Sequence, residues 1–138
     1  MVDDLTPEQR SYCMSRIRSK DTKPEIIVRK IAHSLGYRFR LHRRDLPGKP
    51  DLVFPLRKKV VLVHGCFWHK HDCRFGRVIS ATNRRYWKEK RANNVERDKR
   101  MRRELHRLGW EILVIWECQT RPDRREWLME RLMSFLSS

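Results

Sequence analysis

The sequence contains no feature that would insert the chain into a membrane or export it. No apolar run approaches the roughly 20 residues needed to cross a bilayer. The first residues, MVDDL, are acidic and lack the basic start and apolar stretch of a signal peptide. Internal repeats and low-complexity linkers are also absent from the 138 residues, a length that fits one domain. These absences predict a single-domain cytoplasmic protein, residues 1–138, with no membrane partner.

Acidic residues are scarce relative to basic ones. Asp and Glu number 17 against 33 Lys and Arg, which gives a formal net charge of +16. A folded domain this basic repels itself unless it meets a polyanion, and released counterions then drive binding. No single amphipathic basic segment dominates, so a membrane surface is the weaker alternative. Because the basic residues also flank aromatic and histidine clusters, nucleic-acid binding is favoured over a merely basic surface.

Apolar periodicity predicts a chain in which helices and strands alternate. The expected helices are residues 6–19, 21–35, 83–108 and 123–136, and the expected strands are residues 37–41, 52–54, 59–64 and 110–116. A break in the long helix is expected near Asn93 and Asn94, and residues 65–82 are expected to be irregular. This order predicts an α/β sandwich around a mixed sheet. The strand after the long helix should lie parallel to its neighbour.

Cysteine and histidine gather just after two of the predicted strands. The string HGCFWHKHDC, residues 64–73, follows one strand, and Cys118 follows another. Structural zinc takes four Cys and His ligands. The expected set is Cys66, His71, Cys73 and Cys118. The spacing lacks the paired CxxC knuckles of common zinc fingers and leaves open which of the three clustered histidines binds. The alternative is that the cysteines are small buried hydrophobes and the histidines a solvated patch. Cys13, in the first predicted helix, is expected to be an ordinary helix residue rather than a zinc ligand.

Asp51 is the first candidate for cleavage chemistry. It stands at the head of a short strand directly after Pro50, and the next strand ends in His64. Carboxylate oxygens are the ligands that Mg²⁺ prefers. Glu25, near the start of a helix, could complete such a site, and His64 or His69 could accept a proton. Taken alone, an Asp at a strand start is more often a turn residue, and a Glu on a helix is usually solvated.

Two strings resemble the very short patch repair (Vsr) endonucleases. They are residues 48–54, GKPDLVF, and residues 61–73, VLVHGCFWHKHDC. Residues 94–98, 109–110 and 116–118 resemble the same family in the same order, so that the likeness runs from about residue 10 to residue 118. It implies the restriction-endonuclease-like fold, a three-layer sandwich with a central mixed β-sheet flanked by helices and a structural zinc site. It also implies nicking on the 5′ side of the thymine in T:G mismatches that arise from 5-methylcytosine deamination.

The resemblance implies roles for the candidate catalytic residues. Asp51 is similar to the aspartate shared by two Mg²⁺ ions, with the main chain of Val63 as a further metal contact. His69 resembles the histidine that activates the attacking water, and Glu25 and His64 resemble residues that hold waters or a phosphate. The acidic-x-Lys motif of the superfamily is absent, and Val63 stands where relatives often have Thr. The likeness also assigns His71 rather than His69 to the single zinc ion.

The resemblance further implies that aromatic side chains open a DNA duplex. The residues expected to contact DNA are Phe67, Trp68, Trp87, Met14, Lys90 and Asn94. Phe67, Trp68 and Trp87 would wedge from the major groove, and Met14, in a DNA-contacting helix over residues 1–20, from the minor groove. Trp110 and Trp116 are expected to pack in the core. The expected partners are double-stranded DNA with a T:G mismatch and mismatch-repair proteins, and the chain is expected to be a bacterial monomer acting at the nucleoid.

Two rival functions remain at this point. One is a zinc-stabilised nucleic-acid binding module without catalysis, for which Asp51 would be dispensable. The other is an endonuclease of the same fold with a restriction-type or structure-specific DNA target.

Overall fold

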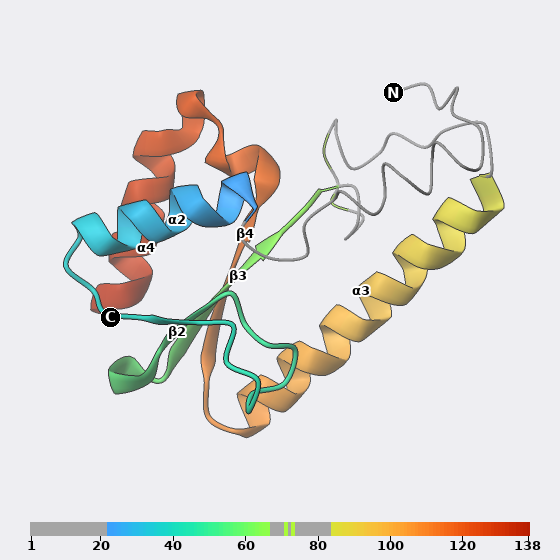
Figure 1. Ribbon diagram of the computed structural model, residues 1–138, viewed down its shortest axis with the longest axis horizontal. Coiled ribbons are helices and arrows are strands. Elements are labelled where there is room, and N and C mark those ends of the chain that lie inside the picture. The colour runs from blue at the N-terminus through green and yellow to red at the C-terminus, as the bar shows by residue number, and fades with distance from the viewer. Residues whose placement is uncertain (1–21, 67–70, 72, 74–83) are drawn as a thin grey trace.

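The computed structural model describes residues 22–66, 71, 73 and 84–138 (Figure 1). Within these residues, four strands form one sheet in the order β1-β2-β3-β4. The strands are β1 (Arg40–Leu41), β2 (Leu52–Phe54), β3 (Lys59–His64) and β4 (Glu111–Trp116). The first three strands pair antiparallel, whereas β3 and β4 run parallel. The predicted mixed sheet, with its last strand parallel to its neighbour, is confirmed.

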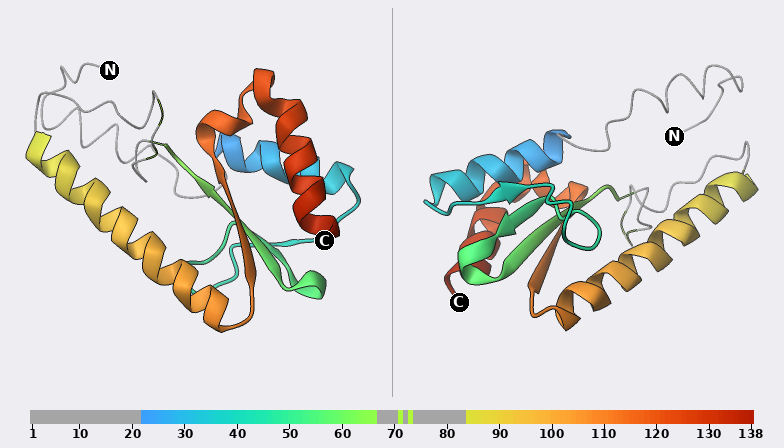
Figure 2. Two further views of the ribbon diagram at one scale, coloured as in Figure 1. Left: turned by 180° about the vertical axis from the view of Figure 1, so that it is seen from behind. Right: turned by 60° about the horizontal axis from the view of Figure 1, so that its bottom comes forward.

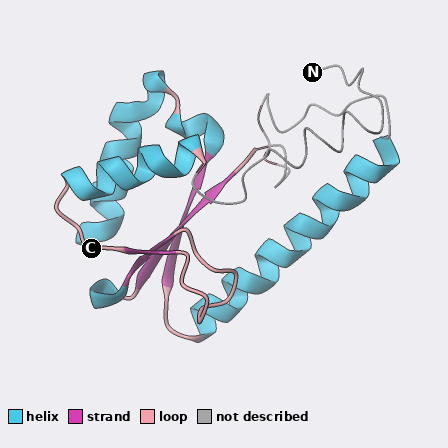
Figure 3. Ribbon diagram, viewed as in Figure 1, coloured by secondary structure: helices cyan, strands magenta, loops and turns pink. Residues whose placement is uncertain are grey.

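Helices lie on both faces of this sheet (Figures 2 and 3). On one face, α2 (Lys23–Ser34) and α4 (Arg125–Ser137) share a core with Leu52 and Phe54. On the other face, Val53 belongs to a second core with Leu105 of α3 (Arg84–Arg107). Successive side chains of a strand point to opposite faces, so β2 contributes to both cores. The result is a helix–sheet–helix sandwich, in agreement with the three layers expected.

The start of α2 follows from its sequence. Thr22 is the N-cap, and its side-chain oxygen accepts a hydrogen bond from the backbone N–H of Glu25 at 3.4 Å. Pro24 occupies the first turn, where its missing N–H costs no helix hydrogen bond. The helix ends before Gly36, whose φ of 87° is a left-handed conformation that glycine adopts freely. This start places Glu25 in the first turn of α2, beside the sheet.

The long helix α3 is mostly exposed. Only Trp87, Arg91 and Leu105 are buried among its 24 residues, and its N-terminal half extends away from the sheet (Figure 1). The predicted break near Asn93 and Asn94 is wrong, because the helix is continuous. Asn lowers helix propensity by well under about 1 kcal/mol per residue, which neighbouring good helix formers outweigh. In the described part of the chain, no helix combines the length and the apolar character needed to span a membrane.

The predicted strand over residues 37–41 is shorter than expected. Only Arg40 and Leu41 pair with β2, which is itself three residues long. Tyr37 and Phe39 pack instead against the core between α2 and α4, and the Phe39 ring lies 5.8 Å from that of Phe54. The alternating pattern therefore came from packing against this core rather than from a ladder of backbone hydrogen bonds.

Candidate functional site

Asp51 is positioned by the antiparallel pairing of β2 with β3. Leu52 lies opposite Val61, which places Asp51 beside the C-terminal end of β3. There the Asp51 Oδ2 accepts a hydrogen bond from the backbone N–H of Val63 at 2.7 Å. The sequence predicted that Asp51 and the end of this strand lie together. The contact fixes the carboxylate against the main chain of the residue expected to share its metal.

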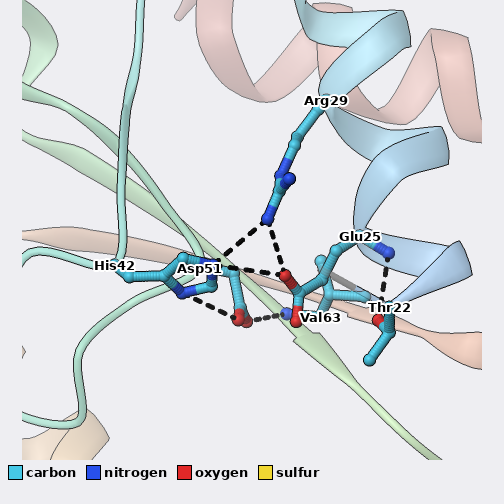
Figure 4. A network of polar contacts seen from close by, with 6 residues as sticks. All are labelled: Thr22, Glu25, Arg29, His42, Asp51 and Val63. Carbon is cyan, nitrogen blue, oxygen red and sulfur yellow. Dashed lines mark hydrogen bonds and ion pairs between the residues drawn. The ribbon is translucent and has the colours of Figure 1, made fainter. Parts of the chain in front are cut away.

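Three further side chains complete a polar group around Asp51 (Figure 4). Glu25 is 3% exposed, and its Oε2 accepts a hydrogen bond from Arg29 Nη2 at 3.0 Å. His42 Nε2 lies 3.4 Å from the same oxygen, and His42 Nδ1 lies 4.0 Å from Asp51 Oδ1. One ligand atom from each of Glu25, His42 and Asp51 fits within 4.8 Å of the others. Glu25, Arg29, His42 and Asp51 are called the carboxylate site below.

Two neighbouring carboxylates are electrostatically costly in this site. Burial raises the pKa of Asp51 to about 7, and the nearby charge of Glu25 pushes it in the same direction. The Val63 N–H and Arg29 oppose this rise. A divalent cation would favour the ionised form of Asp51, because opposite charge within a few ångströms stabilises a carboxylate. The oxygen donors and the raised pKa therefore fit a hard cation such as Mg²⁺.

The predicted zinc ligands come together in a second group. His64 pairs with Trp116 at the ends of the parallel strands β3 and β4. Cys66 and Cys118 each follow two residues later, so both lie just beyond the same edge of the sheet. One ligand atom from each member fits within 4.8 Å of the others. The members are Cys66, His71, Cys73 and Cys118, called the Cys/His cluster below.

Hydrogen bonds and burial shape the Cys/His cluster. Cys66 Sγ accepts from the backbone N–H of Cys118 at 3.3 Å, and Cys118 Sγ lies 3.6 Å from His71 Nδ1. Burial raises the pKa of both the Cys66 and Cys118 thiols. Zinc binds thiolates, so it would have to displace these protons. Three sulfurs and one imidazole nitrogen are a donor set that fits tetrahedral Zn²⁺.

Trp116 packs against the Cys/His cluster rather than in the core. Its ring stacks on His71 at a centroid distance of 4.1 Å and meets His64 edge-on at 5.2 Å. Trp116 is only partly buried, so its expected place in the core is corrected. Trp110 is 7% exposed and belongs to the core under α3, as expected. His64 is 8% exposed at the end of β3.

The residues expected to contact DNA are only partly covered by the structure. Trp87 is 6% exposed, its ring 5.0 Å from that of Tyr86, so it would have to leave this contact to enter a duplex. Lys90 is exposed near the Tyr86 ring, and Asn94 is half-buried one turn further along α3. Outside the described residues lie Met14, Phe67, Trp68 and His69.

Sequence reasoning missed two members of the carboxylate site. Arg29 follows Glu25 by four positions on a predicted helix, a spacing that places both on one face and could have revealed the pair. His42 carried no comparable signal. Its position depends on a left-handed backbone with φ of 48° directly after β1, which no periodic pattern encodes.

Comparison with known proteins places the chain in a family. A family model described as DNA mismatch endonuclease Vsr matches residues 2–75. The chain is 51% identical to the type II nicking enzyme V.XorIIP of Xanthomonas oryzae pv. oryzae, over 86% of this chain and 87% of that one. It is 38% identical to the DNA mismatch endonuclease Vsr of Escherichia coli K12, over 99% and 88% respectively. The chain belongs to the Vsr family.

Membership of the Vsr family places the chain among DNA endonucleases, which agrees with its excess of basic residues. The span matched to the Vsr family contains the whole carboxylate site. It also contains every member of the Cys/His cluster except Cys118. A further relative, the type II nicking enzyme V.NmeAIP of Neisseria meningitidis, is 43% identical over 86% of this chain and 84% of its own length.

Proposed function

We propose that this protein is a strand-specific DNA endonuclease that nicks 5′ of the thymine in T:G mismatches arising from 5-methylcytosine deamination. The observation that carries the proposal is the carboxylate site, where Asp51 is fixed to the Val63 main chain with Glu25 and His42 in reach. The family description as a mismatch endonuclease supports the substrate. The relatives named as nicking enzymes support cleavage of one strand.

Asp51 and the main chain of Val63 would hold two Mg²⁺ ions, which when bound would supply positive charge that polarises the scissile phosphate. The chain's own residues prepare this site. The Val63 N–H fixes one oxygen of Asp51, and Arg29 fixes Glu25, so that neither carboxylate has to reorganise when substrate arrives. Glu25 orients water or a phosphate oxygen, His64 stands at the end of β3, and His69 takes the proton of the attacking water.

The Cys/His cluster holds one structural Zn²⁺ in this proposal. It joins the ends of β3 and β4 to the segment that carries His71 and Cys73. The sequence between Cys66 and His71 contains Phe67, Trp68 and His69, the proposed wedge and general base. A cross-link on both sides of these three residues would lower their conformational freedom before DNA binds.

The proposed substrate is double-stranded DNA opened at the mismatch. Unstacking costs a few kcal/mol per step and is least costly at a mismatched pair, which favours wedge residues that test pairing. Phe67, Trp68 and Trp87 would enter from the major groove and Met14 from the minor groove, with Lys90 and Asn94 contacting the mismatched pair. The exposed basic side chains of α3 would contact phosphates.

The test is a nicking assay on duplexes that differ at one base pair. Zinc-loaded protein with Mg²⁺ is expected to nick a T:G duplex on the thymine strand and to leave the matched T:A and C:G duplexes intact. Asp51→Ala should abolish nicking. Asp45→Asn is the matched control, because Asp45 lies in the same loop and is 61% exposed beside Arg43.

The outcome separates the proposal from its rivals. Duplex binding that survives Asp51→Ala, with no cleavage by the parent protein in any divalent metal, would indicate a binding module without catalysis. Equal cleavage of matched and mismatched duplexes would indicate an endonuclease with another DNA target. The relatives named as type II nicking enzymes are the reason to test this alternative.

A further inference from the structure

The loop between β1 and β2, residues 42–51, ends in Asp51 and lies against the C-terminal half of α3 (Figure 1). Within this loop Gly48 has a φ of 75°, a left-handed conformation that residues with a side chain rarely adopt. A Cβ added to Gly48 would lie 2.6 Å from Met101 Sδ, 3.1 Å from Met101 Cγ and 3.3 Å from Met101 Cβ. The Met101 side chain therefore covers the Gly48 main chain and leaves no room for a methyl group.

Met101 is held at this contact by its own helix. Leu105 follows it by four positions, which places both residues on one face of α3. Leu105 is fully buried and shares a core with Leu46, which lies two residues before Gly48 in the loop. The helix and the loop thus meet in this core and again where Met101 covers Gly48. Because the Met101 Cβ can move only with α3, only the outer atoms of the side chain could give way to a new group at Gly48.

The chain between Gly48 and Asp51 has little freedom to absorb a displacement. Lys49 has a φ of 47°, and its backbone N–H donates to the Leu46 carbonyl at 3.2 Å. Pro50 is fully buried, and its ring fixes its own φ. The Asp51 carboxylate then accepts a hydrogen bond at 2.7 Å from the main chain of β3. A shift imposed at Gly48 would therefore be passed along the loop to Asp51.

We propose that Met101 is a positioning residue for cleavage, which through its contact with Gly48 sets the place of Asp51 at the metal and the scissile phosphate. The inference rests on the proposed function for the role of Asp51. A misplacement of about 1 Å at a reacting centre can cost about 100-fold in rate. A Cβ at Gly48 would require a shift of a few tenths of an ångström or more. A loss of about three- to tenfold is therefore expected.

The first test places a methyl group at the contact. Zinc-loaded Gly48→Ala should nick a T:G duplex about three- to tenfold more slowly in a single turnover, with duplex affinity within about twofold of the parent. Gly36→Ala is the matched control. Gly36 has a φ of 87°, and within the described part of the chain nothing lies within 4 Å of a Cβ added to it. Its variant carries the left-handed strain without the contact and should nick at the parent's rate.

Both glycine variants are compared at a temperature at which circular dichroism shows them folded. Equal rate losses in Gly48→Ala and Gly36→Ala would show that backbone strain alone is responsible, which would overturn the proposal. An unchanged rate in Gly48→Ala would overturn it as well.

The second test shortens the side chain that the methyl group would meet. Met101→Ala should slow nicking by about threefold, because the loop loses the contact that holds it. Met101→Leu has a similar volume and should stay within about twofold of the parent. Met129→Ala, at an exposed methionine of α4, is the control and should nick as the parent does. Parent-like nicking by Met101→Ala would contradict the positioning role.

The third test combines the two substitutions. Gly48→Ala/Met101→Ala lacks the sulfur and the Cγ that the new methyl group would meet, so the loop can return towards its place. The double variant should nick faster than Gly48→Ala and at about the rate of Met101→Ala. A loss equal to the product of the two single losses would show that the positions act independently, and the proposal would then be wrong.

The affinity for Mg²⁺ without DNA distinguishes failure of this inference from failure of the proposed function. Calorimetric titration should show binding weakened by about threefold in Gly48→Ala and restored in the double variant. That pattern in a protein that nicks no T:G duplex would keep the positioning role and remove the substrate. A parent that nicks T:G duplexes, with rate and Mg²⁺ affinity unchanged in Gly48→Ala, would keep the function and overturn the role of Met101.

Discussion

The carboxylate site and the Cys/His cluster lie at the same end of β3 but are held together differently. The carboxylate site is held together by the ion pair between Arg29 and Glu25 and by the contact between Arg29 and His42. The two His42 ring nitrogens also lie close to Glu25 and Asp51. The cluster consists of three cysteines and one histidine, and burial raises the pKa of the Cys66 and Cys118 thiols. The first group keeps its geometry through the protein's own charges. The Cys/His cluster has the donor atoms of a zinc site, in which a bound metal would link its four residues.

The difference predicts separate consequences of metal loss. Removing the cation from the carboxylate site should stop cleavage and leave the fold intact, because Arg29 and the Val63 N–H still hold the carboxylates. Removing zinc should loosen the ends of β3 and β4, and its first effect should be to lower the stability of the fold. The three predictions that follow would break or sharpen this contrast.

The largest effect is expected from the Cys/His cluster. Cys66→Ser should lose bound zinc and lower the unfolding temperature by about 10 °C or more, because structural zinc contributes its binding free energy to folding. Removing Mg²⁺ at fixed zinc content should shift that temperature by less than about 2 °C. Metal analysis and calorimetry on the same samples measure both. Cys13→Ser, at a cysteine that is not among the four predicted zinc ligands, is the control, and a Cys66→Ser variant as stable as the parent would remove the contrast.

A smaller effect, of opposite sign, is expected at Asp51 in metal-free protein. An unfolded Asp titrates near about 3.9, whereas burial raises the folded pKa of Asp51 to about 7. The unfolded state therefore loses its proton first, and stability falls as pH rises from about 4 to about 7 and then stays level. Asp51→Asn avoids this cost, so it should be more stable than the parent above pH 7 by up to about 4 kcal/mol, the equivalent of the difference between a pKa of about 3.9 and one of about 7.

Denaturant unfolding at several pH values checks this effect of Asp51→Asn. The difference between variant and parent should vanish near pH 4 and reach its full size near pH 7. The same comparison with saturating Mg²⁺ should shrink the difference, because the cation binds the ionised parent. A variant that is less stable than the parent at every pH would show that the carboxylate stabilises the fold.

The smallest effect concerns Trp116, which contacts His71 of the Cys/His cluster and His64 at the end of β3. Trp116→Leu removes the stack on His71 and the edge contact with His64, and should cost about 0.5–1.5 kcal/mol while zinc is retained. Nicking should fall by a few-fold, because His64 loses its edge-on contact with the indole ring. Trp116→Phe keeps an aromatic ring and should recover most of the loss. Equal behaviour of the Leu and Phe variants in calorimetry and nicking would mean that the ring contacts carry no such role.

Local signals in the sequence predicted much of the fold. The β-branched run of residues 59–64 predicted β3 with the bounds that the structure shows, and Thr22 with Pro24 predicted the start of α2. The predicted end of the long helix at residue 108 lies one residue beyond the end of α3 at Arg107, and Gly109 follows with a φ of 91°. These features depend on a few neighbouring residues. The length of β1 and the continuity of α3 depend on partners and on propensities summed over many residues, which a local pattern does not contain.

The residues of the candidate site also differ in whether neighbouring residues in the sequence could predict their positions. Ligands that follow strand ends, such as Cys66 and Cys118, could be grouped because parallel strands deliver their ends to one edge of a sheet. Asp51 was found from its turn and strand, and its family resemblance gave it a role. His42 was missed because its place beside Asp51 results from a left-handed backbone at the start of the ten-residue loop between β1 and β2, from which its ring contacts Glu25 and Arg29 of α2.

The central claim is that the carboxylate site performs cleavage and does not hold the fold or the DNA. The most direct measurement is the single-turnover nicking rate of a T:G duplex by Asp51→Asn, with the dissociation constant for the same duplex measured in parallel. The rate is expected to fall by about 10³-fold or more with duplex affinity within about threefold of the parent. A rate equal to that of the parent, or a loss explained entirely by weaker DNA binding, would contradict the account.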